Sequence, residues 1–336
     1  MDWFERLTGF RETDYAATKA KLDVIGDRLH SRVNHRSHGI GTFELASLRT
    51  LRERVQQGGL PGKLRVGAVS GDVRSLHRNR QFEGALFQVA SQFNMLEMVC
   101  PDVTPEMGVT RYAHDATQGP GCAIAAGAAT IYRNYFVPVG DGYGQTSERQ
   151  LDGLGALGRA LSAALRMPVS ALWSMRNGYA LGSRAGLEAI AAHLAGLDAQ
   201  QADQLRGELA IGIHRDVEVT DSSAEFPPKA SQAFCSALPV ACSSVPPRVW
   251  APFANLVLEA AYEATLWAAV RNAQQGGSNL LLLTRLGGGV FGNDDAWIDA
   301  AMRRALTLAS GFALNVRIVS HQAPMSSTRR LIEEFT

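Results

Sequence analysis

Apolar residues in this chain form strand-length runs that alternate with helix-length stripes. Short apolar runs at 63–69, 85–91 and 279–286 predict strands, and a stripe at helical spacing over 251–272 predicts a long helix. Strands that alternate with helices favour an α/β fold, with a mixed, mostly parallel sheet between helices. Further helices are predicted over 122–135, 147–165 and 294–308, a hairpin over 169–183, and strands over 208–220, 232–240 and 315–321.

The first sixty residues differ from the rest of the chain in their pattern. Apolar residues recur there at helical spacing, over 17–29 and again over 45–55. Glycine and proline then interrupt the chain at 58–62. We therefore expect a helical N-terminal extension over 1–60 and a main α/β domain over 63–336.

Charge and cysteine content narrow the classes of partner. The 33 basic and 32 acidic side chains nearly cancel, so no basic field predicts a nucleic-acid partner. No apolar run is long enough to predict a membrane span. The four cysteines are too sparse for a disulfide scaffold and lack zinc-ligand spacing, which favours buried free thiols in a reducing, cytoplasmic compartment. We expect no metal and no cofactor.

The segment after the 279–286 strand is the most informative in the chain. Four glycines occur among the six residues 287–292, and a predicted helix follows. Glycines permit positive φ and close approach of the backbone to a ligand, and a helix N-terminus favours anions. The alternative is a tight strand-to-helix turn, but such a turn needs only one or two glycines. The loop therefore predicts a phosphate site, and it is not a Walker A motif because Asn293 and Asp294 replace its Lys-Ser/Thr pair.

This loop resembles the phosphate-binding loop that ends the ligand site of macrodomains. The matching residues are Gly289-Val290-Phe291-Gly292, between a strand and a helix. The resemblance implies that the loop wraps the diphosphate of ADP-ribose, that Asp72 meets the adenine amino group, and that Asn94 contacts the distal ribose. It assigns ligand binding to Asp72, Val73, Asn94, Gln118, Gly119, Gly287, Gly288, Gly289, Val290, Phe291, Gly292 and Asn293.

A second candidate feature is the alternating strand at 208–220. Its alternation predicts that His214, Asp216 and Glu218 share one face, with Asp221 at the end of the strand. Three interpretations stay open: a solvent-facing edge strand, a catalytic or substrate-binding face, and a metal site formed by His214 and Asp216.

The combination of this strand with the glycine loop resembles an arginine-specific branch of the macrodomains. That resemblance implies removal of ADP-ribose from arginine on a modified protein, with ubiquitin as the candidate protein. It assigns substrate and water handling to Asp216, Glu218, Asp221 and Asp294. Carboxylates suit a cationic guanidinium leaving group because they bind it and can supply a proton. The alternatives are a module that binds ADP-ribose without cleaving it, and a metal-dependent phosphoesterase.

Overall fold

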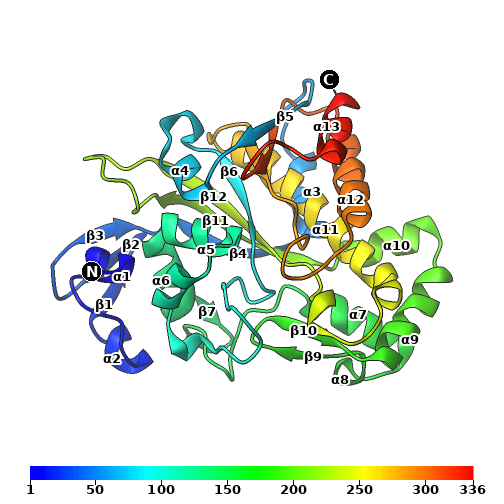
Figure 1. Ribbon diagram of the computed structural model, residues 1–336, viewed down its shortest axis with the longest axis horizontal. Helices are drawn as coiled ribbons and strands as arrows, with labels where there is room; N and C mark the ends of the chain where they lie inside the picture. The colour runs from blue at the N-terminus through cyan, green and yellow to red at the C-terminus, as the bar shows by residue number, and fades with distance from the viewer. Residues whose placement is uncertain (336) are drawn as a thin grey trace.

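A seven-stranded sheet forms the centre of the molecule in the computed structural model, which describes residues 1–335 (Figure 1). Among its strands only β11 runs antiparallel to its neighbours, and every other neighbouring pair is parallel. The predicted mixed, mostly parallel sheet is therefore confirmed. The strand order is β4 (Thr42–Ser47), β11 (Ala210–Glu218), β12 (Lys229–Cys235), β6 (Leu86–Ala90), β13 (Leu280–Leu283), β14 (Asn315–Ser320) and β5 (Arg65–Ser70).

Helices cover both faces of this sheet, as the alternating pattern predicted. The near-continuous apolar run of β13 fits its central position, because a strand covered on both faces has no solvent side. One face is covered by α3 (Leu48–Gln56), α11 (Pro247–Gln274) and α12 (Asp295–Leu308), with α9 (Arg184–Ala195) packed on α11, and the other by α4 (Val73–Arg78), α5 (Gln118–Ala125) and α6 (Gly127–Tyr135). Although α11 has 28 residues, no helix within residues 1–335 is long and apolar enough to cross a membrane.

Residues 122–135 form parts of two helices, where the sequence predicted one. The break lies at Ala126, whose φ of −112° and ψ of 56° are not helical. The Gly127 N–H donates to the Thr220 hydroxyl, and the Thr130 hydroxyl donates to the Ala123 carbonyl. These two contacts replace the regular hydrogen bond across the break, so tertiary structure overrides the helical pattern.

The expected helical extension over 1–60 is wrong for residues 22–47. Helices α1 (Trp3–Thr8) and α2 (Tyr15–Lys19) are followed by a three-stranded antiparallel sheet, and β4 then joins the central sheet before α3. Leu22 and Leu29 are buried, but they lie on paired strands of a hairpin that turns at Gly26, where φ is +60°. Their spacing of seven fits a helix equally well, which explains the error. The strands of the small sheet are β1 (Leu22–Ile25), β2 (Arg28–Ser31) and β3 (Ser37–Gly39).

The predicted alternation along β11 is also wrong in its second half. The strand has a β-bulge between His214 and Val217, and Asp216 adopts a φ of +56° there. A bulge adds one residue to one strand and shifts which side chains face which side. His214 is consequently buried against α6, whereas Asp216 is exposed, so the two do not share a face.

The remaining elements complete the lower part of the molecule in Figure 1 and the C-terminus. The predicted hairpin is confirmed: β9 (Trp173–Arg176) and β10 (Tyr179–Gly182) meet at Asn177-Gly178, both at positive φ. The other elements are β7 (Pro138–Val139), β8 (Gly142–Tyr143), α7 (Gly155–Leu165), α8 (Val169–Leu172), α10 (Ala199–Arg206), α13 (Ser326–Glu333), and the short 3₁₀ turns Arg80–Phe82, Pro105–Met107, Thr110–His114 and Val240–Cys242.

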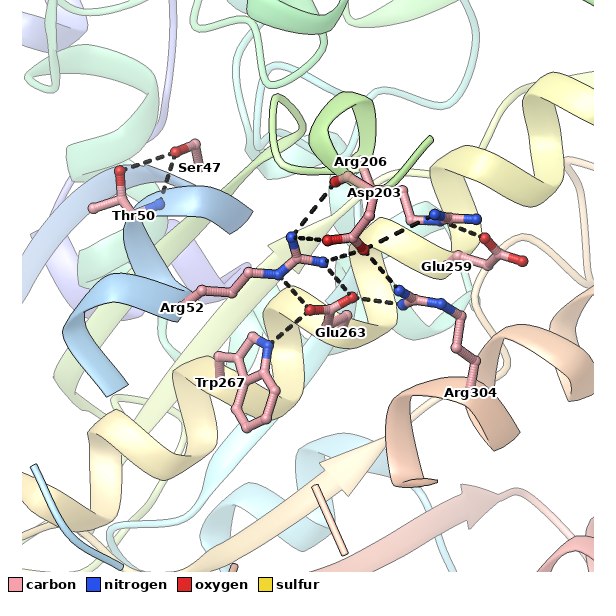
Figure 2. Close-up of polar contacts among 9 residues, drawn as sticks. All are labelled: Ser47, Thr50, Arg52, Asp203, Arg206, Glu259, Glu263, Trp267 and Arg304. Carbon is pink, nitrogen blue, oxygen red and sulfur yellow. Dashed lines mark hydrogen bonds and ion pairs between the residues drawn. The ribbon is translucent and has the colours of Figure 1, made fainter. Parts of the chain in front are cut away.

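A network of ion pairs joins the helices on the α11 face of the sheet (Figure 2). Arg52 on α3 forms paired hydrogen bonds with Glu263 on α11 and with Asp203 on α10. Arg304 on α12 bonds the same two carboxylates. Each buried charge therefore has opposite charges at hydrogen-bond distance, which is the condition for burying ions without a large net cost. We refer to Arg52, Asp203, Arg206, Glu259, Glu263, Trp267 and Arg304 as the helix-joining network.

Candidate functional site

A cavity of about 410 Å³ lies where the parallel strands β6 and β13 end. Ligands bind α/β proteins preferentially at the carboxyl ends of parallel strands, because loops and helix N-termini meet there. Two predicted segments form opposite parts of the wall: the first turn of α5 and the loop over 287–291. The structure thus brings together Gln118, Gly119, Gly287, Gly289, Val290 and Phe291 from the predicted ligand-binding set.

Some backbone N–H groups of the glycine loop form hydrogen bonds within the loop, and others are open to the cavity. The N–H groups of Gly288, Gly292 and Asn293 donate to carbonyls within the loop or just before it. Across residues 1–335, the N–H groups of Gly289 and Val290 find no protein acceptor, and both residues line the cavity. Consecutive free N–H groups in such a loop form a concavity that binds anions.

Two of the loop glycines are required by packing. Gly287 and Gly292 have φ of +78° and +67°, a region that side chains disfavour. A Cβ at Gly287 would lie 2.5 Å from the Ala237 Cβ, and one at Gly292 would lie 2.8 Å from the Ala241 Cβ. Asn293 is buried and donates to the Leu238 carbonyl, so it anchors the loop. Gly288, Gly292 and Asn293 therefore shape the loop without lining the cavity.

The first turn of α5 supplies the opposite wall with open backbone donors. The N-cap residue Thr117 makes no capping hydrogen bond, and the first N–H groups of a helix have no partner inside it. The side chain of Gln118 is committed elsewhere, because it accepts from the Ala90 N–H and donates to the Gln88 carbonyl. What α5 offers a ligand is thus its N-terminal backbone, which favours a negatively charged group.

Glu97 is the buried acid of the cavity. Its side chain lines the cavity, the residue is only 4% exposed, and among the described residues its Oε1 has no hydrogen-bond partner. A Cβ at Gly119 would lie 2.2 Å from Glu97 Oε2 and 2.1 Å from the Ala90 carbonyl oxygen. Only glycine at 119 therefore lets this carboxyl reach the first turn of α5.

The surroundings of Glu97 favour its protonated form. Burial raises the pKa of its carboxyl well above the ordinary value of 4.5, the nearby Arg133 lowers it, and Asp115 raises it further. Arg133 is itself fully buried and has no ion-pair partner within residues 1–335; its guanidinium bonds the Met95 carbonyl, His214 Nδ1 and the Thr130 hydroxyl. The Glu97 N–H donates to the buried Tyr112 hydroxyl, which fixes the backbone at this position.

Aromatic side chains form one side of the cavity. The rings of Tyr179 and Phe291 lie 5.3 Å apart between their centroids, and both line it. The Tyr179 hydroxyl donates to the Met98 carbonyl, so this ring is held against the segment that carries Glu97. An apolar surface beside open N–H donors suits a ligand with both a sugar or base and a phosphate.

Besides Gly288, Gly292 and Asn293 in the loop, three more of the predicted ligand-binding residues lie outside the cavity lining. Asp72 caps α4 by accepting from the Ser75 N–H, and Val73 is buried against α5. Asn94 is fully buried; its side chain donates to the Gln150 side chain and accepts from the Leu96 N–H. Its polar atoms are therefore occupied within the protein.

The four predicted catalytic acids are not gathered at the cavity either. Asp216 is exposed at the β11 bulge, and Glu218 binds His38 Nδ1 and the Gly39 N–H. Asp221 is held by Arg74 and Arg78, and Asp294 caps α12. The β11 residues lie beside Lys229, where the parallel strand β12 begins, whereas the cavity lies where parallel strands end.

The arrangement also separates the residues of the suggested metal site. His214 is fully buried beside Arg133, which together with burial lowers the pKa of its imidazole, and Asp216 lies exposed beyond it. Within residues 1–335 no group of three His, Cys, Asp or Glu side chains is placed to hold a metal ion. The geometry therefore offers the phosphoesterase alternative no support.

Glu97 was not among the ligand-binding or catalytic residues predicted from the sequence, although a signal was present. Glu97 is a lone acid in the apolar stretch Met95-Leu96-Glu97-Met98, and because acids are rarely buried unless they are paired, an acid within such a stretch is informative. Tyr179 was missed because it lies 82 residues from Glu97 in the sequence, so only the fold brings them together.

Comparison with known proteins gives only distant matches. No family model and no curated protein matches the chain. The chain does match solved structures of poly(ADP-ribose) glycohydrolase. The enzyme from Deinococcus radiodurans in complex with ADP-ribose is 13% identical over 87% of this chain and 94% of that chain, with a TM-score of 0.47. The enzyme from Thermomonospora curvata is 13% identical over 92% and 94%, with a TM-score of 0.45.

These matches correct the expected membership of an arginine-specific branch. The solved structures that the chain matches are poly(ADP-ribose) glycohydrolases, including the apo form from Deinococcus radiodurans at 14% identity and a TM-score of 0.46. The arginine-specific assignment depended on the acidic strand as well as the glycine loop, and the bulge in β11 removes the one-sided face that it required. At such identities and TM-scores the function has to be inferred from the site itself.

Proposed function

We propose that this protein is an ADP-ribosyl hydrolase that cleaves the glycosidic bond at C1 of the distal ribose. The diphosphate would lie between the first turn of α5 and the Gly289-Val290 backbone, because both line the cavity and both offer open N–H groups. The observation that carries the proposal is Glu97, a buried carboxyl without a hydrogen-bond partner on Oε1, at the wall of this cavity.

In this reaction Glu97 first donates a proton to the leaving group and later accepts a proton from water. The protonated carboxyl donates its proton to the leaving atom as the bond to C1 breaks and its electron pair departs with the leaving group. Water then adds to the oxocarbenium-like C1 and returns a proton to the carboxylate, so the products are ADP-ribose and the unmodified acceptor. Burial raises the pKa of Glu97, which favours the protonated form that this step requires.

A module that only binds ADP-ribose would use the same backbone donors but would gain nothing from Glu97. Burying a carboxyl without a full set of hydrogen bonds is unfavourable, and such groups concentrate at catalytic sites. Glu97 therefore favours hydrolysis over binding alone.

The test compares turnover and binding for the same variants. Glu97→Gln keeps the shape of the side chain and removes its proton donor, so turnover should fall by about 10²- to 10⁴-fold while binding of ADP-ribose is retained. Glu148→Gln is the matched control, because Glu148 is exposed and lies outside the cavity. Release of free ADP-ribose is measured in EDTA from arginine-linked, glutamate-linked and polymeric substrates, and binding by calorimetry.

Each outcome decides between the functions. Release that depends on Glu97 supports the hydrolase, and the substrate that is cleaved identifies the linkage. Binding without release from any substrate would leave a module that only binds. Absence of both would remove ADP-ribose as the ligand.

A further inference from the structure

A second cleft, of about 1040 Å³, lies between the N-terminal segment, α4 and the loop over 219–228. It is separate from the candidate functional site. Its residue Glu218 pairs with Lys229 at the start of β12, while Cys235 at the end of β12 pairs with Ala90 at the cavity. Six residues of strand at about 3.3 Å each place the two ends roughly 20 Å apart.

Positively charged side chains are concentrated at this cleft, although the charges of the whole chain nearly cancel. The formal net charge of the whole protein is +1. Five arginines line this cleft, against the three carboxylates of Glu218, Asp221 and Glu225. The arginines come from two distant parts of the sequence, and they are Arg6, Arg28, Arg36, Arg74 and Arg78.

Asp221 organises one side of the cleft. Its carboxylate accepts from Nε and Nη2 of Arg74 and from Nη1 of Arg78, and Arg6 Nη2 lies 3.9 Å from it. The Asp221 side chain is only 7% exposed, whereas those of Arg6 and Arg78 are 54% and 43% exposed. One buried carboxylate thus holds several guanidiniums at the cleft while their outer faces stay accessible.

The other side of the cleft has arginines without acidic partners. In residues 1–335 no carboxylate lies within ion-pair distance of Arg28 or Arg36. The Arg28 guanidinium donates to the hydroxyl and carbonyl of Ser37, and Arg36 donates to the Arg6 carbonyl. These bonds orient the two exposed side chains, and Glu218, which is held by His38, acts on the charge of Arg28 only from beyond ion-pair distance.

We propose that this cleft binds a compact phosphoryl anion, such as the diphosphate group of a nucleotide or a phosphorylated metabolite. Five guanidiniums against three carboxylates leave two positive charges, which a compact dianion neutralises. The planar guanidinium fork matches phosphate oxygens in pairs. Arg28 and Arg36 would contact the anion, and Asp221 would act as a positioning residue for Arg74 and Arg78. A long acidic peptide fits less well, because its carboxylates would meet Glu218 and Glu225 on the wall.

The first experiment locates binding residue by residue. Phenylglyoxal modifies accessible arginines, and mass spectrometry of the peptides gives the rate at each one with and without pyrophosphate. We expect modification of Arg28 and Arg36 to slow by about threefold or more at saturating pyrophosphate, since bound oxygens cover the guanidinium. Arg184, on the exposed surface of α9, should be unchanged. Arg285 lines the candidate functional site, so its protection reports binding there separately.

The second experiment measures affinity. Replacing both Arg28 and Arg36 by Gln should weaken pyrophosphate binding in the cleft by about tenfold or more, and Arg184→Gln should not. Both replaced side chains are exposed, so folding is retained and circular dichroism can verify it. Equal pyrophosphate affinity in the double variant and the wild type, or no protection of Arg28 and Arg36 in the wild type, would overturn the proposal. Protection by a peptide rich in Asp and Glu but not by pyrophosphate would overturn it in favour of a protein partner.

Discussion

Two buried glutamates, on opposite faces of the sheet, show how differently this fold treats the same side chain. In the helix-joining network, Glu263 accepts hydrogen bonds from Arg52, Arg304 and Trp267 (Figure 2). In the cavity, Glu97 is equally buried, yet its Oε1 has no partner. Burial acts to raise the pKa of both carboxyls, but the bonds to Glu263 lower its pKa below the ordinary value, whereas that of Glu97 stays raised.

The comparison distinguishes a buried carboxylate that stabilises the fold from a buried carboxyl that is available for proton transfer. A carboxylate that is fully paired contributes to the packing of the helices around it, and its proton affinity is low. A carboxyl left without partners in a cavity has a raised pKa, which favours the protonated form that a proton donor needs. Partner count and pKa direction together therefore distinguish the two roles where burial alone does not.

The largest effect on stability is expected at Glu263. Glu263→Gln leaves Arg52 and Arg304 partly unpaired in a buried position, so the free energy of unfolding should fall by about 3 kcal/mol. Urea unfolding measures this change. Glu97→Gln, which removes no hydrogen bond on Oε1, should stay within about 1 kcal/mol of the wild type. Comparable losses of unfolding free energy in both variants would contradict the distinction between the two sites. Glu188→Gln, at an exposed position on α9, serves as the control.

An intermediate effect is expected in the glycine loop, where two positions can be compared directly. Gly287→Ala should lower stability by about 1–3 kcal/mol, because its φ is +78° and the new Cβ would meet Ala237. Gly289→Ala has no atom within 4 Å of its new Cβ, so stability should be unchanged within about 0.5 kcal/mol. Because Gly289 lines the cavity, the affinity of the Gly289→Ala protein for ADP-ribose should be about tenfold lower than that of the wild type. Calorimetry and urea unfolding of both variants provide the readouts. Equal affinity in Gly289→Ala and wild type would exclude this backbone from the binding site.

The smallest effect is a difference in pH dependence between the two glutamates. Folding raises the pKa of Glu97, so the folded state binds its proton more tightly and this group favours folding less as the pH rises above 4.5. Folding lowers the pKa of Glu263, so its contribution is present above 4.5 and is lost as the pH falls through its folded value. Relative to wild type, Glu97→Gln should gain stability as the pH rises, and the deficit of Glu263→Gln should shrink in acid. Urea unfolding across a pH series decides whether the two curves diverge in this way.

Local pattern was sufficient for the parts of the fold that depend on local interactions. The apolar run of β13, the glycine loop after it and the turn at Asn177-Gly178 were all predictable, because burial and positive φ restrict the residue types directly. The fold class followed from the order of these elements.

The remainder depended on contacts between distant segments. Leu22 and Leu29 suit a helix or a hairpin, and only the surface of α6 beneath them selects the hairpin. The bulge at Asp216 has no marker such as glycine, so the alternation along β11 could not show that it breaks. Asn94 matched a family position by order, but its neighbours Gln150 and Leu96 occupy its side chain.

The position of β4 has a consequence for the order of events during synthesis. Its partner in the sheet is β11, so paired residues such as Ala46 and Ile211 lie about 165 residues apart in the chain. At 5–20 residues per second, the ribosome takes roughly 10–30 s to make β11 after β4 has formed. During that interval the hydrogen-bonding groups of β4 have no strand to pair with, and the nascent chain exposes them to chaperones or to other chains. β4 is thus made well before it can reach its native position in the sheet.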